Sequence, residues 1–296
     1  MDFLLKALEK RKHLLHAEND AVRIFDGLGD GCRGVSIDAY AGSWVVATQG
    51  ERIEPQLLDA LKKQKASVYW KRLSQSQKES PVLLSGKALD SPFVAMESSV
   101  KYEINYQAGY SQGIFLDQRE NRKRVRERVS AGDKILNTSA YTGAFSVCAA
   151  LGGASTTTLD LSQPYLDWGK RNFLLNSQYP ETHFWCKGDT FHWLERFAKK
   201  ERKFDGIILD PPTFSRDQKG KVFRVEKDYA QLVQMASACL APGGWILATT
   251  NCRKLNDAAF LKMVKEGCAR KHQATVHPMP EEYRDVPFLK SVWLEV

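Results

Sequence analysis

The chain has 296 residues, of which 43% are hydrophobic and 26% charged, enough to bury an α/β core and to form a second, smaller unit. No apolar run can span a bilayer, and the amphipathic, charge-rich start is no signal peptide, so we expect a cytoplasmic protein without membrane attachment. Six cysteines without a Cys-x-x-Cys pair argue against a metal site or a disulfide framework, while the net charge of +8 favours an anionic partner such as RNA.

Residues 1–95 predict a small β-rich unit made of a helix and β-hairpins. The leucines near the start fall on or near one face of a helix, and from Val22 the sequence changes to short alternating runs separated by glycines. The large aromatic residues of this unit are Phe25, Tyr40, Trp44, Tyr69 and Trp70. They can stack on bases, but a small core filled by large rings is the favoured interpretation. A polar stretch from Ser74 to Pro92 predicts a loop, which we take as the seam before a second unit, residues 96–296.

A strongly basic helix is predicted from about Asp117, whose side chain can cap the first turn. Its basic residues are Arg119, Arg122, Lys123, Arg124, Arg126 and Arg128. Such a density of positive charge can face RNA phosphates. A solvated helix with Glu120 and Glu127 as local ion-pair partners explains the same pattern.

The second unit is organised around residues 133–160, which predict the first half of a nucleotide-binding α/β unit. A short apolar strand runs into a turn of small residues centred on Gly143, and then into a helix that stops on two glycines. The next strand ends at Asp160, where a carboxylate can accept hydrogen bonds from ribose hydroxyls. Because the turn lacks the Gly-x-Gly-x-x-Gly pattern, a nucleoside ligand without phosphates fits better than a dinucleotide.

Further predicted strands place polar side chains at their carboxyl ends. One ends at Asp189, which can receive the exocyclic amine of adenine or cap the following helix. A buried strand ends at Asp210, and the two prolines after it predict a rigid turn that aims this carboxylate at a ligand. Cys252 lies at the end of a fifth strand. The alternation of strands and helices predicts a doubly wound, mostly parallel sheet of about seven strands, with the final "SVWLEV" in an antiparallel pair at its edge.

Together these stretches resemble the class I S-adenosylmethionine-dependent methyltransferases, and within them the family that modifies large-subunit ribosomal RNA at cytosine C5 or guanine N7. The resemblance is carried by "AYTGAFSVCAALGGA", "LDLSQPYLDWGKRNFLLN", "GIFLDQRENR", "LDPPTFSR" and "HPMPEEYRDVPFLKSVWLEV". It covers most of the second unit and, more loosely, the hairpin unit. It implies a Rossmann-like methyltransferase sheet, S-adenosylmethionine as the cofactor, and RNA as the substrate.

The resemblance also implies roles for individual residues. The turn from Tyr141 to Gly143 would contact the methionine part of the cofactor, Asp160 would hold the ribose, and Asp189 would meet the adenine. The segment from Phe115 to Arg119 would lie over the cofactor, and Asp210 with its prolines would form the pocket for the target base. The implied cofactor-binding residues are Phe115, Asp117, Gln118, Arg119, Tyr141, Thr142, Gly143, Asp160, Ser162, Asp189 and Asp210, and the implied catalytic residues are Asp210 and Cys252.

Two reaction chemistries remain open. Methylation of cytosine at C5 requires a nucleophile to add at C6 first, and a thiolate such as that of Cys252 is the usual choice. Methylation of guanine at N7 uses an existing lone pair, so that positioning and electrostatic help suffice. The "DPPT" motif is nearer the N7 group and "TTNCRK" retains the cysteine of the C5 group. Of the two, we favour cytosine C5, because Cys252 is predicted at a strand end beside the pocket.

Two other classes of function are alternatives. A non-catalytic RNA-binding protein on a methyltransferase fold would keep the basic helix, but the retained Asp160 and Asp210 argue against it. A small-molecule methyltransferase would share the cofactor site, but it has no need for the basic helix.

Overall fold

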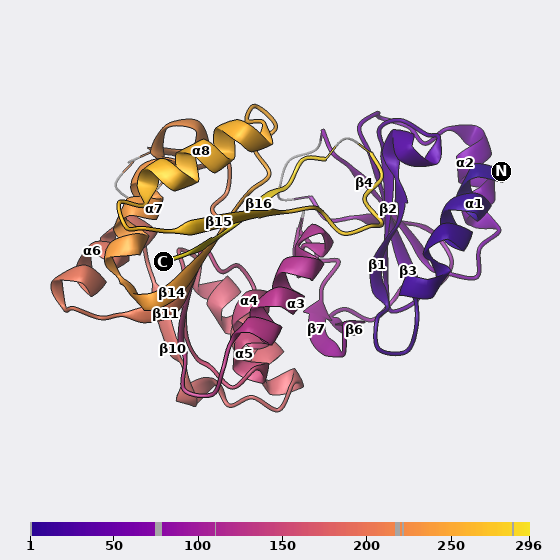
Figure 1. Ribbon diagram of the computed structural model, residues 1–296. Coiled ribbons are helices and arrows are strands. Elements are labelled where there is room, and N and C mark those ends of the chain that lie inside the picture. The colour runs from indigo at the N-terminus through magenta and orange to yellow at the C-terminus, as the bar shows by residue number, and fades with distance from the viewer. Residues whose placement is uncertain (1, 75–78, 110, 217–219, 221, 286) are drawn as a thin grey trace. The chain divides into compact units, whose positions relative to one another are not determined.

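The computed structural model describes residues 2–74, 79–109, 111–216, 220, 222–285 and 287–296 (Figure 1). The chain forms two compact units: Met1–Arg119 with Pro280–Pro287, and Glu120–Met279 with Phe288–Val296. The sequence pattern places the seam near residue 95, whereas packing divides the chain between Arg119 and Glu120 and returns a short C-terminal segment to the first unit.

The first unit is built on a five-stranded sheet of order β1-β2-β3-β4-β5, in which β3 and β4 are parallel and the other pairs antiparallel. Its elements are α1 (Asp2–Arg11), β1 (Ala21–Asp26), β2 (Val35–Tyr40), β3 (Ser43–Thr48), α2 (Pro55–Lys62), β4 (Val68–Arg72), β5 (Val82–Ser85), and a separate hairpin of β6 (Phe93–Glu97) and β7 (Val100–Ile104). Of the five aromatic residues predicted to fill the core, Phe25, Tyr40 and Tyr69 are buried, whereas Trp44 and Trp70 are partly buried. Strand β5 falls within the loop predicted over residues 74–92, of which 75–78 lie outside the described residues.

Buried charges fasten residues 280–287 to the first unit. Arg11 is only 1% exposed, and its guanidinium donates to the backbone carbonyl of Glu282 at 2.6 Å and to the carboxylate of Asp30 at 2.6 Å. Asp26 accepts two backbone N–H bonds from the same segment, at 2.6 and 2.7 Å. Because a buried charge is costly without its partners, these contacts fix where the segment lies within this unit.

The second unit contains a seven-stranded sheet of order β10-β9-β8-β11-β14-β16-β15, which confirms the predicted architecture. Its strands are β8 (Lys134–Thr138), β9 (Ser155–Asp160), β10 (Phe184–Lys187), β11 (Phe204–Leu209), β14 (Leu240–Thr250), β15 (Gln273–His277) and β16 (Lys290–Glu295). The strands from β10 to β14 in this order are parallel, and β16 runs antiparallel to both β14 and β15, as predicted for the final strand. A hairpin of β12 (Phe214–Arg216) and β13 (Val222–Arg224) stands outside the sheet.

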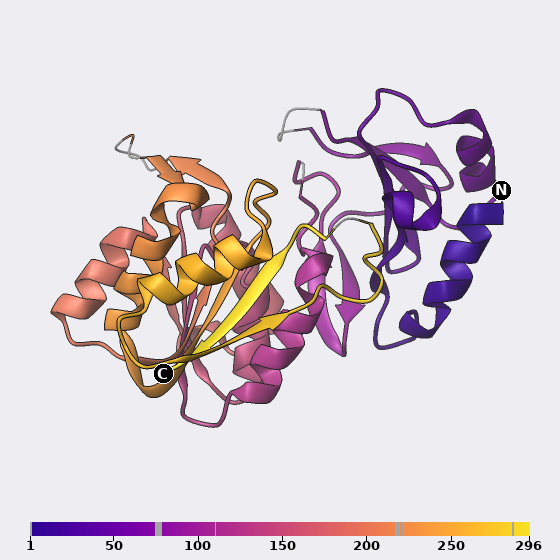
Figure 2. The same cartoon turned by 45° about the horizontal axis from the view of Figure 1, so that its top comes forward.

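Helices cover both faces of this sheet (Figure 2). One face carries α3 (Arg119–Arg128), α4 (Ala144–Leu151) and α5 (Gln163–Leu175), and the other carries α6 (Thr190–Lys199), α7 (Val225–Ala238) and α8 (Asp257–Gly267). The first face buries one hydrophobic cluster that includes Val125, Phe145 and Trp245, and the second face buries a larger one around Leu232 and Phe260. Across the described ranges, no helix is long and apolar enough to cross a membrane.

Parallel pairing brings five strand ends to one edge of the sheet. Leu159 of β9 pairs with Thr138 of β8, Thr138 pairs with Leu209 of β11, and Leu209 pairs with Ala248 of β14. The residues that follow these positions therefore lie at a common carboxyl edge, which is where open α/β sheets bind ligands.

Replacing Arg11 with methionine should destabilise the first unit, because among the described residues Asp30 would keep only Lys10, at 3.6 Å, as a charged partner. We expect the free energy of unfolding to fall by about 3–5 kcal/mol. Urea denaturation followed by circular dichroism measures this change. Arg33→Met, which removes an exposed guanidinium from the same unit, is the control and should change stability by less than about 0.5 kcal/mol. Equal losses in the two variants would contradict the role given to Arg11.

Candidate functional site

Five loops lie at the carboxyl edge of the second unit. They begin at or directly after the parallel strands and span residues 139–143, 160–162, 188–189, 210–213 and 251–253. Every site residue predicted in this unit lies in one of these loops: Tyr141, Thr142, Gly143, Asp160, Ser162, Asp189, Asp210 and Cys252. The other predicted residues, Phe115, Asp117, Gln118 and Arg119, belong to the first unit.

The turn after β8 has a backbone conformation that few side chains adopt. Ser139 and Tyr141 have φ angles of 50° and 51°, and Gly143, which precedes α4, has a φ of 70°. The side-chain amide of Asn172 donates to the carbonyl of Thr142 at 2.9 Å and so holds the turn from behind. Left-handed backbone at non-glycine residues persists only where the surroundings hold it, and it recurs at ligand-binding sites.

Asp160 ties two of the loops together. Its Oδ2 accepts the backbone N–H of Tyr141 at 2.8 Å, and its Oδ1 accepts that of Ser162 at 2.9 Å. Burial raises the pKa of the Asp160 carboxyl, and the backbone N–H bonds oppose that shift. Because each carboxylate oxygen has two lone pairs, this side chain can hold both turns and still accept hydrogen bonds from ligand hydroxyls.

Asp189 is the N-cap of helix α6. Its Oδ1 accepts the backbone N–H of His192 at 2.9 Å, which confirms the capping alternative. The preceding Gly188 has a φ of 147°, and a Cβ there would lie 2.8 Å from the indole nitrogen of Trp193. The N–H of Gly188 donates to the carbonyl of Asp160 at 2.9 Å, so the loops after β9 and β10 are also joined.

The Asp210 loop is fixed by hydroxyl groups. Thr249 donates its hydroxyl to Oδ1 of Asp210 at 2.6 Å, and the buried hydroxyl of Tyr229 lies 2.9 Å from the carbonyl before Asp210 and 3.0 Å from that of Thr249. Thr213, after the two prolines, donates to the side-chain oxygen of Asn251 at 2.9 Å. The loops after β11 and β14 therefore form one hydrogen-bonded unit with a carboxylate in a defined position.

The loop after β14 is also fastened to the start of β16. The ammonium of Lys290 donates to the backbone carbonyls of Cys252 and Phe288, both at 3.0 Å, and Lys290 is only 7% exposed. The guanidinium of Arg253 lies 5.2 Å from the ring centre of Phe288. Cys252 itself is 1% exposed and belongs to the hydrophobic cluster on the α7 and α8 face.

Sequence reasoning missed two residues at this edge, Thr249 and Lys290. Lys290 is the one lysine within the apolar run "VPFLKSVWLEV", and this isolated charge was the feature that could have indicated a buried role. Such a lysine is solvated at the end of an exposed strand and bound to carbonyls in a buried one, and the sequence alone does not distinguish the two. Thr249 gave no signal, because threonine is common in strands.

Helix α3 does not present all of its positive charge to solvent. Arg119 and Arg122 are 6% and 2% exposed, and Arg119 forms an ion pair with Glu282 at 2.9 Å. The side chains of Lys123 and Arg128 are 55% and 46% exposed. Only the exposed members can contact a phosphate without rearrangement of the structure.

Comparison with known proteins gives consistent matches. A family model described as S-adenosylmethionine-dependent methyltransferase matches residues 64–291. YwbD of Bacillus subtilis (strain 168), provisionally named a ribosomal RNA large subunit methyltransferase, is 35% identical over 99% of this chain and 79% of its own length. Ribosomal RNA large subunit methyltransferase K of Neisseria meningitidis serogroup B is 38% identical over 68% of this chain and 56% of its own. The crystal structure of SMU.776 in complex with SAH matches 100% of this chain and 80% of that one, with a TM-score of 0.91 and 28% identity.

Proposed function

Because this chain belongs to the family of S-adenosylmethionine-dependent methyltransferases, we propose that it methylates a base of large-subunit ribosomal RNA. The observation that carries the proposal is the similarity along almost the entire chain to a relative whose name specifies that RNA. The net charge of +8 supports it, because positive charge attracts a polyanion at long range.

The loops at the carboxyl edge fit S-adenosylmethionine, a nucleoside cofactor without phosphates. Asp160 retains acceptor capacity for ribose hydroxyls, and the adjacent N–H of Ser162 keeps its carboxylate in place. The turn from Tyr141 to Gly143 is proposed to contact the methionine part, and Asp160 and Asn172 hold this turn in place. Asp189, which follows the neighbouring strand β10, is proposed to meet the adenine, because β10 pairs with β9 and the two strands end at the same edge. When bound, the cofactor supplies an electrophilic methyl group.

Replacing Asp160 with alanine should weaken cofactor binding. It removes charge-assisted hydrogen bonds to the ribose and releases the N–H of Tyr141, so we expect the Kd for S-adenosylmethionine to rise about ten- to a hundredfold. Isothermal titration calorimetry measures it. Asp167→Ala, which removes an exposed carboxylate from α5, is the matched control and should bind as the parent does. Unchanged affinity in Asp160→Ala would exclude this residue from the cofactor site.

The segment from Phe115 to Arg119 is proposed to cover the cofactor, and this role rests on the family resemblance. Phe115 is 49% exposed, as expected of a side chain that contacts a ligand. Gln118 is buried, and Arg119 is held by Glu282, so their side chains are fixed in place. Asp117 is partly buried.

Asp210 is proposed to position the target base. Thr249 holds one of its carboxylate oxygens, and the rigid prolines limit the backbone around it. A carboxylate accepts hydrogen bonds from amino and ring N–H groups, which guanine presents together on its Watson–Crick edge and cytosine presents only as an exocyclic amine. Anchoring that edge would leave the rest of the ring free to face the cofactor.

The burial of Cys252 supports guanine N7 as the target atom. A thiolate that adds to cytosine C6 must reach the face of the ring, and reactive cysteines are accordingly partly exposed in an electropositive environment. Cys252 is 1% exposed and packs among hydrophobic side chains. The N7 lone pair needs no such nucleophile. We therefore propose 7-methylguanine as the product, in place of the 5-methylcytosine favoured from the sequence.

Replacing Cys252 with alanine then tests the chemistry. For N7 methylation we expect a methylation rate close to that of the parent and a stability loss of about 1 kcal/mol from packing. Cys239→Ala is the control, because Cys239 is equally buried in the same cluster. Single-turnover methylation of ribosomal RNA measures the rate. A Cys252→Ala variant that binds the cofactor normally but loses turnover, while Cys239→Ala does not, would establish C5 chemistry instead.

The product itself identifies the reaction. Nucleosides from the large-subunit ribosomal RNA of cells with and without the gene should differ in one 7-methylguanosine by mass spectrometry. Purified protein with S-adenosylmethionine should restore that nucleoside in RNA from the deletion strain. If neither 7-methylguanosine nor 5-methylcytidine changes while the protein still binds the cofactor, ribosomal RNA is not the substrate.

A further inference from the structure

The hairpin of β12 and β13 follows the Asp210 loop directly and stands outside the large sheet (Figure 2). Successive residues of a strand point to alternate faces, and directly opposite residues of an antiparallel pair share a face. The observed register therefore places Phe214, Arg216, Val222 and Arg224 on one face of the hairpin and Ser215 and Phe223 on the other. The two faces have different surroundings.

The face that carries Phe223 is fastened to the core of the second unit. Phe223 is only 8% exposed, and its ring centre lies 5.8 Å from that of Phe191. At the base of the hairpin, the N–H of Val225 donates to the carbonyl of Thr213 at 3.2 Å. Thr213 in turn donates its hydroxyl to Asn251. The hairpin is therefore held beside the loop that is proposed to position the target base.

The opposite face presents an aromatic ring and two guanidinium groups to solvent. Phe214 is 50% exposed, and Arg216 and Arg224 are both exposed. The guanidinium of Arg224 lies 5.5 Å from the ring centre of Phe214. Within the described ranges, neither guanidinium is paired with a carboxylate. Both positive charges are therefore available to an anionic ligand that approaches the ring.

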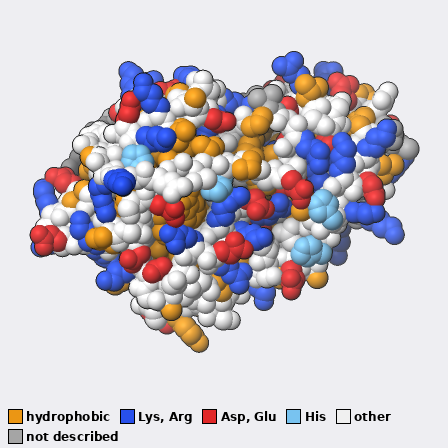
Figure 3. Space-filling model, in the orientation of Figure 1, with side chains coloured by type: hydrophobic (Ala, Val, Ile, Leu, Met, Phe, Trp, Pro, Cys, Tyr) orange, Lys and Arg blue, Asp and Glu red, His pale blue; other side chains and the backbone are white. Residues whose placement is uncertain are grey.

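An exposed ring beside arginines suits single-stranded RNA. Unpaired bases stack on aromatic rings and on guanidinium planes, and guanidinium groups bind phosphates. Basic and acidic side chains are interspersed over the face of the second unit that Figure 3 shows, so local contacts have to align the RNA. Two prolines and Thr213 separate Phe214 from Asp210, which places the ring next to the target base and not on it.

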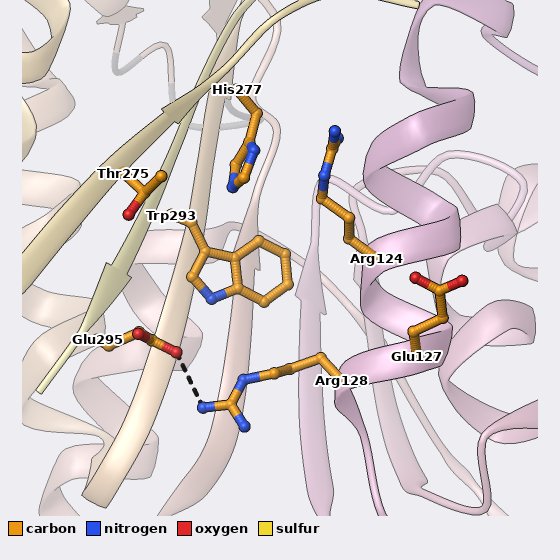
Figure 4. A pocket seen from close by; sticks show the side chains of 7 residues that line it. All are labelled: Arg124, Glu127, Arg128, Thr275, His277, Trp293 and Glu295. Carbon is orange, nitrogen blue, oxygen red and sulfur yellow. Dashed lines mark hydrogen bonds and ion pairs between the residues drawn. The ribbon is translucent and has the colours of Figure 1, made fainter.

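The pocket of about 360 Å³ between α3 and the last two strands offers no comparable surface (Figure 4). The indole of Trp293 in this pocket is only 7% exposed, and the indole of Trp245 stacks on one of its faces with ring centres 4.6 Å apart. Glu127 and Glu295 also line the pocket and would repel a phosphate. An unpaired nucleotide finds an accessible ring on the hairpin instead.

We infer that the exposed face of the hairpin binds the nucleotide next to the methylated base in single-stranded RNA. Phe214 stacks on the base of this neighbouring nucleotide, and Arg216 and Arg224 contact the phosphates on either side of it. The inference rests on the proposed function, because it assigns a second nucleotide of the same RNA to the same unit. The hairpin thereby fixes the register of the RNA strand relative to Asp210.

Replacing Phe214 with leucine tests the stacking contact. The ligand is a fragment of large-subunit ribosomal RNA from the deletion strain that spans the methylated nucleotide, and filter binding gives its Kd at several salt concentrations. We expect Phe214→Leu to weaken binding about tenfold without a change in salt dependence, and Phe214→Trp to bind as the parent does. Phe184→Leu is the matched control. Phe184 is 54% exposed and lies 4.6 Å from the guanidinium of Arg202, but it stands at the start of β10, away from the carboxyl edge, so binding should change by less than about twofold.

The arginines should show the opposite signature. Arg216→Gln and Arg224→Gln should each reduce the slope of the salt dependence by about 0.7, because each loses one phosphate contact to a single strand. Lys199→Gln, which removes an exposed charge from α6, should leave the slope unchanged. Affinity for S-adenosylmethionine and the melting temperature should match those of the parent in all of these variants, because every replaced side chain is exposed.

The fluorescence of 2-aminopurine, which stacking quenches, locates the base independently. Placed on either side of the target nucleotide in a synthetic fragment, it should be quenched on binding at one of the two positions, and Phe214→Leu should abolish that quenching. Equal losses of affinity in Phe214→Leu and Phe184→Leu, or the same quenching in Phe214→Leu as in the parent, would overturn the inference. A loss of binding to ribosomal subunits but not to the naked fragment would also overturn it, since the hairpin would then contact a protein.

Failure of the proposed function gives a different result. If the parent binds S-adenosylmethionine but does not methylate this RNA, the proposed function is wrong and the inference fails with it. If the parent methylates the fragment and Phe214→Leu has the same Kd and the same rate, only the inference is wrong.

Discussion

The parallel register of five neighbouring strands is the constraint on which the site depends. Thr138, Leu159 and Leu209 stand at matched positions in their strands, so the chain leaves the sheet at one edge each time. Residues separated by more than a hundred positions in the sequence therefore lie together at the carboxyl edge of the sheet. A shift of one residue in any strand would turn its side chains to the other face of the sheet and displace the loop that follows.

The loops at this edge are not independent of one another. Asp160 joins the turns after β8 and β9, Gly188 joins the next strand end to Asp160, and Thr249 holds Asp210. Lys290 then fastens the loop after β14 to the antiparallel strand. A ligand that meets such a network finds its partners already oriented, and little conformational entropy is lost on binding.

The basic side chains of helix α3 have two different environments in the second unit, one buried and one exposed. Buried Arg122 lies with its guanidinium 5.9 Å from the ring centre of Phe145, and its neighbour Asn121 donates to Ser291 at 2.8 Å, so this side of α3 packs on the sheet. Lys123 and Arg128 lie on the exposed side. The same basic stretch thus contributes both to the packing of the fold and to its surface, which a count of charges cannot separate.

The sequence by itself determined the alternation of the parallel strands and their helices in the second unit, because strands and helices have different hydrophobic periods and their ends carry glycines, prolines and capping residues. It also determined that Asp160, Asp189 and Asp210 stand at strand ends, since a strand's end is a local property. It did not predict the hairpin of β12 and β13. Only the tertiary structure decided that Cys252 is buried and that Lys290 reaches its carbonyl. Burial depends on which distant segments pack against a residue, and no local pattern records those partners.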